Sequence, residues 1–313
     1  MFAPFAAWLR REGVPFQEDA AIAPHLYFRI GGTVSLLVTP ASAAQRRGVL
    51  ARLAADRLPG LVIGGGSNIA FPDGRVRAVV VLAAGEEPVP PVLLPGGEAV
   101  DVDAGARNQP FLAWCAANGV AGLEFLSGIP GTLGGAAAVN AGAFGRSMAD
   151  VLLGAEIVGE GGAVGRVDAG DFAFRYRDSR FKLGDGALLT LRLRRDPGAA
   201  EAIAAKVREH LEYRARRHPS YRLASAGCFF KNPPATAGKA SAGRLIEECG
   251  LKGAVAGALA VAEEHANFLV NRGGGTFADL QRLEEEVRSA VAARCGVVLE
   301  REVIYVSLDG RKY

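Results

Sequence analysis

The sequence contains little cysteine, and what it has is scattered. Cys115, Cys228, Cys249 and Cys295 are its four cysteines, and no two of them form a C-x-x-C pair. Zinc sites and redox-active dithiols usually depend on such close spacing, so the pattern predicts neither. It is typical of reduced thiols in a cytosolic protein.

Long hydrophobic runs are also missing. No uninterrupted apolar stretch approaches the ~18 residues that a membrane-spanning helix needs. The first residues, MFAPFAAWLRREG, have no basic segment ahead of the apolar ones, and their apolar run is too short for a secretion signal. We therefore expect a cytoplasmic protein with no membrane partner.

Charge is nearly balanced, with a formal net charge of +3 at pH 7 and no run of five or more basic residues. This charge pattern gives little support for a nucleic-acid partner, and none is expected, whereas an anionic small ligand is compatible with it. Half of the 313 residues are hydrophobic, 22% are charged and 41 are glycine, as in a packed enzyme of mixed helices and strands. Single cores stop growing at roughly 250–300 residues, so two domains are expected.

Hydrophobic periodicity predicts where helices and strands alternate. A break at Asp196-Pro197-Gly198 separates a strand-rich part from a more helical one. We expect an α+β protein with a first domain at 1–196, in two subdomains of about 1–80 and 81–196, and a second domain at 197–313. The predicted strands are 35–38, 61–63, 78–82, 99–102, 164–167, 187–193, 268–271 and 297–305, and the predicted helices are 109–118, 199–217, 241–249 and 277–294.

Two glycine-rich segments stand out. The first, GGGSN at 64–68, follows a predicted strand and could turn successive backbone N–H groups toward a phosphate. It lacks the Rossmann pattern, because position 69 is Ile69. A tight structural turn is the alternative interpretation of this segment.

The second segment, GIPGTLGG at 128–135, runs into small residues and Asn140. Such a backbone can lie against a planar cofactor, although a small-residue helix packed in a core is the alternative. Together the two segments predict a long, phosphate-bearing ligand. The predicted cofactor-binding residues are Gly64, Gly65, Gly66, Ser67, Asn68, Gly128, Ile129, Pro130, Gly131, Thr132, Gly134, Gly135 and Asn140.

These segments and several others resemble one family, the UDP-N-acetylenolpyruvoylglucosamine reductases of peptidoglycan synthesis (MurB). The resemblance covers nearly the whole chain, and the spacing from Tyr176 to Cys228 is similar to that of the family's shorter form, which lacks an extra substrate loop. Its motifs are FRIGG (28–32), GGGSN, GLEF (122–125), GIPGTLGG, NAGAFG (140–145), YRDS (176–179), SAGCFFKNP (225–233), SAGRLIE (241–247), HANF (265–268) and LEREV (299–303).

The resemblance implies a two-part FAD-binding fold of the vanillyl-alcohol oxidase type, followed by a C-terminal α/β domain that covers the substrate. FAD is expected to be bound non-covalently and NADPH to be the hydride donor. The implied reaction reduces UDP-N-acetylglucosamine enolpyruvate to UDP-N-acetylmuramate, in cell wall synthesis and so in cell shape and division. The partners expected are a UDP-sugar and no metal, and the protein is expected to be a monomer.

The resemblance also implies three catalytic residues, Arg177, Cys228 and Glu302. A guanidinium stays charged and can bind a carboxylate with two parallel donors, which suits Arg177 to an enolate-like transition state. Glu302 would polarise or steer the proton, with Glu300 as the alternative because it points to the same face of a strand.

Cys228 departs from the family, which usually has Ser at this position as the proton donor. A thiol, with an ordinary pKa of about 8.5, gives up its proton more readily than an alcohol. It is also a weaker hydrogen-bond donor and can be oxidised. A working proton donor and impaired or altered chemistry both remain open.

Substrate-binding roles are expected for Tyr176, Arg217, Lys231 and Asn232. Arg217 belongs to a basic cluster at residues 214–218, at the end of a predicted helix. Binding of a diphosphate is one interpretation of this cluster, and a solvated helix end is the alternative. His265 is expected only to pack near the nucleotide site. Two other functions remain possible, an FAD-linked oxidase or dehydrogenase of the same fold and a non-catalytic flavin-binding sensor.

Overall fold

The computed structural model describes residues 1–84, 89–220, 222–234 and 241–313. The chain forms two compact units, each assembled from several segments. The first contains residues 1–20, 34–65 and 77–214, and the second contains 21–33, 66–76 and 215–313. The predicted domain limits near residues 80 and 196 divide the chain differently and stay a prediction.

The first unit contains a four-stranded sheet in the order β1 (Phe16–Ala21), β2 (Thr33–Val38), β5 (Arg75–Leu82) and β3 (Gly60–Ile63). Side chains of its strands pack with helices α1 (Ala3–Arg11) and α2 (Ala43–Ala55) in one hydrophobic core. Strands β3 and β5 are parallel, so Ile63 and Leu82 end at the same edge of the sheet. The first glycine segment starts at that edge.

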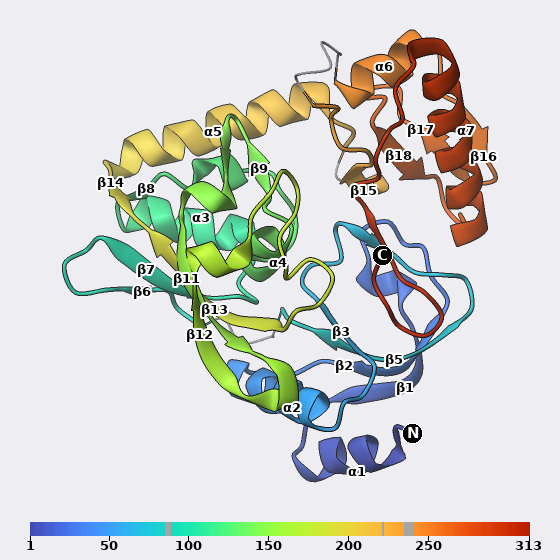
Figure 1. The fold of residues 1–313 in the computed structure, drawn as a ribbon. Coiled ribbons are helices and arrows are strands. Elements are labelled where there is room, and N and C mark those ends of the chain that lie inside the picture. The colour runs from blue at the N-terminus through green and yellow to red at the C-terminus, as the bar shows by residue number, and fades with distance from the viewer. Residues whose placement is uncertain (85–88, 221, 235–240) are drawn as a thin grey trace. The chain divides into compact units, whose positions relative to one another are not determined.

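A second sheet of the first unit has five antiparallel strands in the order β12 (Val164–Asp168), β11 (Leu152–Val158), β13 (Ala187–Arg194), β7 (Ala99–Asp103) and β6 (Val92–Leu93). Figure 1 shows β11 to β13 as long, strongly curved strands, with α3 and α4 beside them. The core here includes Phe111, Leu133 and Leu191, which come from α3 (Asn108–Ala117), α4 (Leu133–Ala138) and β13. The second glycine segment therefore leads into a helix that is anchored in this core.

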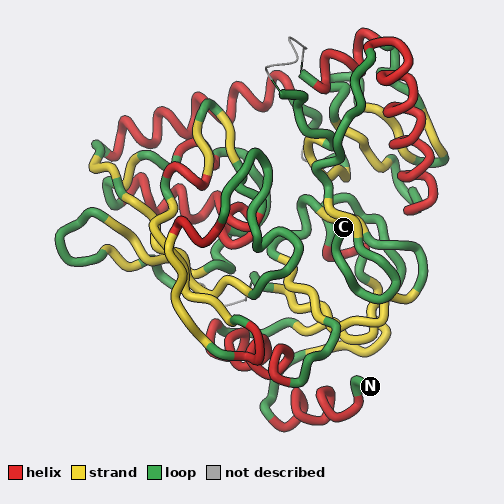
Figure 2. Tube along the Cα trace, in the orientation of Figure 1, coloured by secondary structure: helices red, strands yellow, loops and turns green. Residues whose placement is uncertain are grey.

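The second unit has a four-stranded sheet in the order β15 (Ala224–Cys228), β18 (Phe268–Asn271), β17 (Leu259–Val261) and β16 (Val255–Ala256). Helices α6 (Ala242–Glu248) and α7 (Phe277–Cys295) pack beside these strands, as Figure 2 shows in red and yellow. A parallel pair, β4 (Ile69–Ala70) and β19 (Ile304–Tyr305), also belongs to this unit.

The remaining elements are short, apart from α5 (Ala200–Arg217), whose last three residues belong to the second unit. None of the described helices is long and apolar enough to cross a membrane. The short elements are η1 (Ala23–His25), β8 (Val120–Ala121), η2 (Glu124–Leu126), β9 (Gly142–Ala143), β10 (Arg146–Ser147), η3 (Met148–Asp150), η4 (Glu160–Gly162), η5 (Ala169–Phe172) and β14 (Asp196–Pro197).

Most predicted elements are confirmed to within a few residues, and Gly119 has the predicted left-handed backbone, with φ +63°. The strand predicted at 297–305 is wrong in extent, because only residues 304–305 form a regular strand. Between them and α7, Arg301 makes one isolated bridge, with Phe230. The segment then changes partner, since Ile304 pairs with Ile69 of β4.

Candidate functional site

The two glycine segments meet inside the first unit. A Cβ added to Gly64 would overlap the side chain of Thr132, and one added to Gly65 would overlap the Cα atom of Gly131. The backbones therefore approach more closely than any side chain would allow. The two segments are therefore neighbours at these positions, which a single ligand bound by both would require.

The second glycine segment is held by the start of α3. The backbone N–H of Asn108 donates to the carbonyl of Gly131 (3.1 Å), and its Nδ2 donates to the carbonyl of Ile129 (3.0 Å). Gln109 adds hydrogen bonds to both Gly128 and Ile129. Since Asn108 and Gln109 hold three residues of the segment, they belong to the candidate site, and no sequence motif had indicated them.

The side-chain oxygen of Asn108 is in an unusual environment. Its side chain is almost fully buried, with 1% of the residue exposed, and its Oδ1 has no hydrogen-bond partner within the described part of the protein. A buried polar atom without a partner costs free energy, on the order of 1–3 kcal/mol. Such an atom suits a bound molecule that supplies a hydrogen-bond donor.

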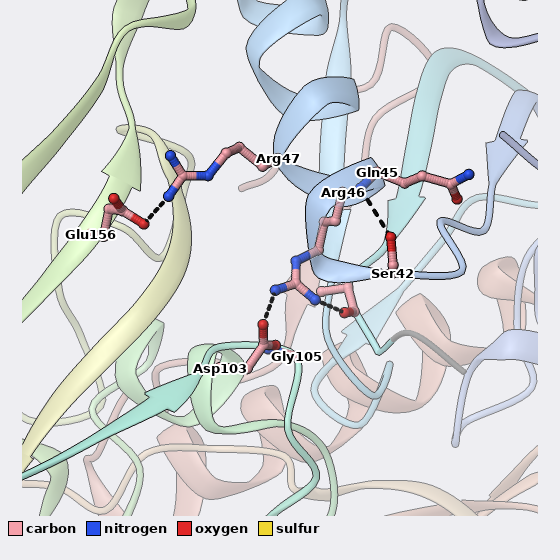
Figure 3. A network of polar contacts seen from close by, with 8 residues as sticks. Ser42, Gln45, Arg46, Arg47, Asp103, Gly105 and Glu156 are labelled. Carbon is pink, nitrogen blue, oxygen red and sulfur yellow. Dashed lines mark hydrogen bonds and ion pairs between the residues drawn. The ribbon is translucent and has the colours of Figure 1, made fainter. Parts of the chain in front are cut away.

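A buried arginine connects the segments that carry both glycine loops. Arg46, on α2, forms an ion pair with Asp103, with 2.5 Å between Nη2 and Oδ2, and its Nη1 donates to the carbonyl of Ala83 (2.8 Å). Figure 3 shows its side chain directed at Asp103, while the neighbouring Arg47 reaches a different carboxylate, that of Glu156. The side chains of Arg46 and Asp103 are 4% and 9% exposed.

Each partner of Arg46 is connected by hydrogen bonds to one of the two glycine loops. Ala83 donates its N–H to the carbonyl of Ile63, the residue before Gly64. Asp103 accepts a hydrogen bond from the N–H of Gly105 (2.6 Å), and the adjoining Ala104 carbonyl accepts from the N–H of Gly134 (2.8 Å). Arg46 therefore ties together the turns on which the two loops are built.

Arg177, the predicted catalytic arginine, is half-buried in a turn of the first unit. Its Nη2 donates to the carbonyl of Gly142 (2.5 Å) and its Nη1 to the carbonyl of Asn140 (3.4 Å). Its φ of +54° lies in the left-handed region, which a residue other than glycine rarely adopts. Strained backbone of this kind often occurs at functional sites.

The side chain of Asn140 stabilises this turn through two hydrogen bonds. It is 6% exposed, its Nδ2 donates to the carbonyl of Arg175 (2.8 Å), and its Oδ1 accepts from the N–H of Ala149 (3.0 Å). The amide was predicted to contact the cofactor, and these bonds give it a structural task in placing Arg177. Tyr176 is 51% exposed, and the guanidinium carbon of Arg177 lies 5.1 Å from its ring centroid.

In the second unit, the end of the first glycine segment is hydrogen-bonded to the backbone on either side of position 303, next to the predicted catalytic residue Glu302. The carbonyl of Asn68 accepts from the N–H of Ile304 (3.1 Å), and its Nδ2 donates to the carbonyl of Glu302 (3.5 Å). The N–H of Glu302 in turn donates to the carbonyl of Phe229 (2.8 Å). These bonds place Glu302 beside the residue that follows Cys228.

Cys228 ends strand β15 and is half-buried. It pairs with Phe268 of β18 after an irregularity in the register, and the preceding Gly227 has φ +78°. Its side chain packs against a small apolar cluster that includes Phe268 and Val270. A β-bulge of this kind changes the direction in which a strand's side chains point.

A buried network of hydrogen bonds stabilises the segment around Glu302. Glu284, on α7, accepts hydrogen bonds from the Tyr305 hydroxyl (2.7 Å) and from Nη1 of Arg301 (3.5 Å). The Arg301 guanidinium carbon also lies 3.6 Å from the ring centroid of Tyr305. Burial and the charge of Glu284 raise the pKa of Tyr305, so its hydroxyl stays protonated and continues to donate.

The structure separates the two candidate carboxylates by their surroundings. Glu300 is 72% exposed at its side chain and forms an ion pair with Lys231 (2.5 Å), whereas Glu302 is half-buried. The Oδ1 atom of Asn232 accepts from the N–H of Ala242 (3.0 Å) at the start of α6. Arg217 is exposed at the end of α5.

The predicted site residues therefore fall into two groups. Arg177, Tyr176, Asn140 and most of the glycine residues belong to the first unit. Cys228, Glu302, Arg217, Lys231, Asn232 and the end of the first glycine segment, residues 66–68, belong to the second. Among the described residues, no group of three or more His, Cys, Asp and Glu side chains could hold a metal ion.

The N-terminal part of the chain defines the class of protein. Residues 34–168 match a family model described as an FAD binding domain. This range contains the joined glycine loops, Asn108 and Asn140, so the buried Oδ1 of Asn108 and the close approach of the two glycine backbones fit FAD. The chain is an FAD-binding protein with a separate C-terminal part, as the resemblance implied.

The particular family follows from the rest of the chain. Residues 218–306 match the model of the UDP-N-acetylenolpyruvoylglucosamine reductase C-terminal domain. The chain is 40% identical to the UDP-N-acetylenolpyruvoylglucosamine reductase of Geobacter metallireducens, covering 97% of both chains. The chain therefore belongs to the UDP-N-acetylenolpyruvoylglucosamine reductase (MurB) family, and the resemblance described above is confirmed.

Two further relatives support the assignment to this family. The enzyme of the same name from Acidiphilium cryptum is 40% identical, over 94% of this chain and 92% of that one. The crystal structure of UDP-N-acetylenolpyruvylglucosamine reductase (MurB) from Thermus caldophilus is 30% identical, with a TM-score of 0.76, covering 93% of this chain and 98% of that one. The two-part fold with its C-terminal domain is thus shared with a solved member of the family.

Proposed function

We propose that the protein catalyses the NADPH-dependent, FAD-mediated reduction of UDP-N-acetylglucosamine enolpyruvate to UDP-N-acetylmuramate in peptidoglycan synthesis. The observation that carries the proposal is the 40% identity with the Geobacter metallireducens reductase over 97% of the chain. The joined glycine loops and the oriented Arg177 support it from within the structure.

When bound, FAD would supply the redox chemistry, the transfer of a hydride from NADPH to the substrate. Residues 64–68 and 128–135 are the proposed cradle of the cofactor, with Asn108 Oδ1 as an acceptor for one of its donors. A cradle with few side chains lets backbone N–H groups approach phosphate oxygens closely.

Arg177 is the proposed stabiliser of the negative charge that develops on the substrate. Its side chain is already oriented by the carbonyls of Gly142 and Asn140. A charge held in place before the reaction requires no reorganisation at the moment when negative charge forms on the enolpyruvyl carboxylate. The bonds that place the guanidinium therefore contribute to the rate.

Cys228 Sγ is the proposed donor of the proton to the carbon next to the substrate carboxylate. Glu302 is the proposed partner that steers this proton. Its half-buried side chain supports this choice, because the exposed Glu300 already pairs with Lys231. A carboxylate away from bulk water exerts a stronger field on a neighbouring proton.

Substrate binding is proposed for Tyr176, Arg217, Lys231 and Asn232. The exposed ring of Tyr176 offers a flat surface, and the cations of Arg217 and Lys231 suit a diphosphate. Lys231 would exchange Glu300 for a phosphate oxygen on binding. The monomeric state, the cytoplasmic location and the use of NADPH are part of this proposal.

An anaerobic flavin assay tests the proposal. Purified protein loaded with FAD is mixed with NADPH under argon, and UDP-N-acetylglucosamine enolpyruvate is then added. Bleaching of the yellow colour by NADPH, followed by recovery only with the enolpyruvyl sugar, is the expected result. Recovery only with oxygen would instead identify an oxidase, and no bleaching would identify a flavin-binding sensor.

A further inference from the structure

Two of the cysteines come together in the second unit, although 46 positions separate them in the sequence. Cys249 follows the last turn of α6 and Cys295 is the last residue of α7, and their Sγ atoms lie 3.8 Å apart. Figure 1 shows the two helices packed together in the C-terminal part. The spacing of the cysteines in the sequence did not predict this pair, because the contact is formed only by the tertiary fold.

We propose that Cys249 and Cys295 are a redox modification site, which low-molecular-weight disulfides such as oxidised glutathione convert to an intramolecular disulfide. A disulfide has about 2.05 Å between its sulfur atoms, so the two sulfur atoms must approach by less than ~2 Å. Both side chains are half-buried at the edge of a hydrophobic core, where a reagent can reach them.

The chemistry balances in two exchange steps. One cysteine loses its proton, and its thiolate attacks a sulfur of oxidised glutathione, so that one reduced glutathione leaves and a mixed disulfide remains. The second cysteine, as its thiolate, then attacks the protein sulfur of that mixed disulfide and expels the second glutathione. Two protein thiols are oxidised, and one oxidised glutathione is reduced to two molecules of glutathione.

The surroundings predict how fast the exchange occurs. Burial, and then the hydrogen bond with Cys295, raise the pKa of the Cys249 thiol, while Glu248 adds to the rise and Arg294 opposes it. Since the thiolate is the reactive form, the exchange should speed up as the solution becomes more alkaline.

The other two cysteines provide internal controls. Cys115 is 0% exposed, and burial raises the pKa of its thiol strongly, so it should stay reduced. Cys228 is half-buried and packs against a small apolar cluster that includes Phe268. Modification of Cys228 would add a glutathione, and only a paired thiol can lose hydrogen without any addition.

The test uses the full chain with FAD, reduced and then incubated with oxidised glutathione. We expect two free thiols to disappear, the intact mass to fall by that of two hydrogen atoms, and peptide mapping to join Cys249 to Cys295. The Cys228→Ala variant should behave in the same way. Cys249→Ser and Cys295→Ser should each fail to form the bond.

Thermal unfolding gives a second measurement on the wild-type chain. A bridge that closes a loop of 46 residues should raise the unfolding temperature of the oxidised protein by about 5 °C, and dithiothreitol should reverse the rise. The proposal is overturned if both thiols survive the oxidant, if they gain only glutathione, or if the bond involves Cys228 or Cys115. None of these outcomes depends on the reductase activity.

Discussion

Arg46 and Asp103 form an ion pair whose two side chains are almost completely buried, with 2.5 Å between Nη2 and Oδ2. Removing two charges from water is costly, and a buried pair often stabilises a protein no more than packed apolar residues would. This pair nevertheless binds the carbonyl of Ala83 and the N–H of Gly105 as well. We interpret it as a device that positions the two glycine loops.

The first prediction separates this positioning from stability. Arg46→Met should lower FAD affinity by about 10-fold or more and destabilise the protein by about 3–5 kcal/mol, because Asp103 is left buried without its partner. The double variant Arg46→Met/Asp103→Leu should recover stability but not FAD affinity. FAD titration by fluorescence and urea unfolding of the apoprotein provide the two measurements.

The matched control is the adjacent arginine. Arg47, which pairs with Glu156 and is 47% exposed at its side chain, should tolerate Arg47→Met with a loss of about 0–1 kcal/mol and normal FAD binding. Recovery of FAD affinity together with stability in the double variant would show that the Arg46 pair has only a structural role.

The second prediction concerns the unsatisfied oxygen of Asn108. Asn108→Ala removes the atom proposed to accept from FAD, and the bond to Ile129, so the dissociation constant for FAD should rise by about 10-fold. Gln109→Ala, which removes a more exposed amide from the same loop, should change it less. Equal effects of the two substitutions would argue against a contact between Asn108 and FAD.

The third prediction concerns the geometry of Arg177. Arg177→Lys keeps the charge but loses the planar fork that the carbonyls of Gly142 and Asn140 orient, so kcat should fall by about 100-fold. FAD content and reduction by NADPH should be unchanged. Arg180→Lys, in the same loop, is the control and should keep normal kcat, and a similar loss there would refute the assignment.

The fourth prediction concerns the thiol at position 228. Cys228→Ala should leave flavin reduction by NADPH intact and slow its reoxidation by the enolpyruvyl sugar by at least about 100-fold, because the proton donor is missing. Cys228→Ser should remain active and should lose sensitivity to peroxide, which the thiol confers. Stopped-flow absorbance of each half-reaction tests this, and normal reoxidation in the alanine variant would contradict it.

The fifth prediction follows from His265. Burial, together with the charge of Lys252, lowers the pKa of its imidazole, whose Nδ1 accepts from the N–H of Asn267 (3.2 Å). The unfolded chain therefore binds a proton more readily than the folded one. This contribution to stability is present above the unfolded pKa of about 6.5 and is lost as the pH falls below it. Urea unfolding at pH 7.5 and pH 5.5 should show a smaller loss in His265→Gln than in the wild type.

Local patterns were enough to predict elements such as β18 and α7, the latter ending at Gly296 in the left-handed conformation. Helix α2 was not predicted. One position of its buried face is Arg46, beside Val49, Leu50 and Leu53, so a charged residue interrupts the apolar periodicity. The partner that justifies this charge is Asp103, and a contact at that distance in sequence leaves no local signal.

The candidate site shows the same limit. The glycine segments stand out in the sequence as compact motifs, and Arg177 was predicted from the YRDS motif of the family resemblance. Asn108 was missed, because its importance lies in a buried oxygen and in bonds to residues about twenty positions away. The contact between Cys249 and Cys295 was missed for the same reason.

The approach of Gly65 to Gly131 restricts how this chain can change. A methyl group on Gly65 would collide with the Gly131 backbone, which has no side chain to move aside. Neither a compensating mutation at position 131 nor any rotamer can relieve that collision, because glycine is already the smallest residue. In a library of engineered variants, glycine should therefore be kept at position 65, and substitutions should be directed to other positions of the two loops.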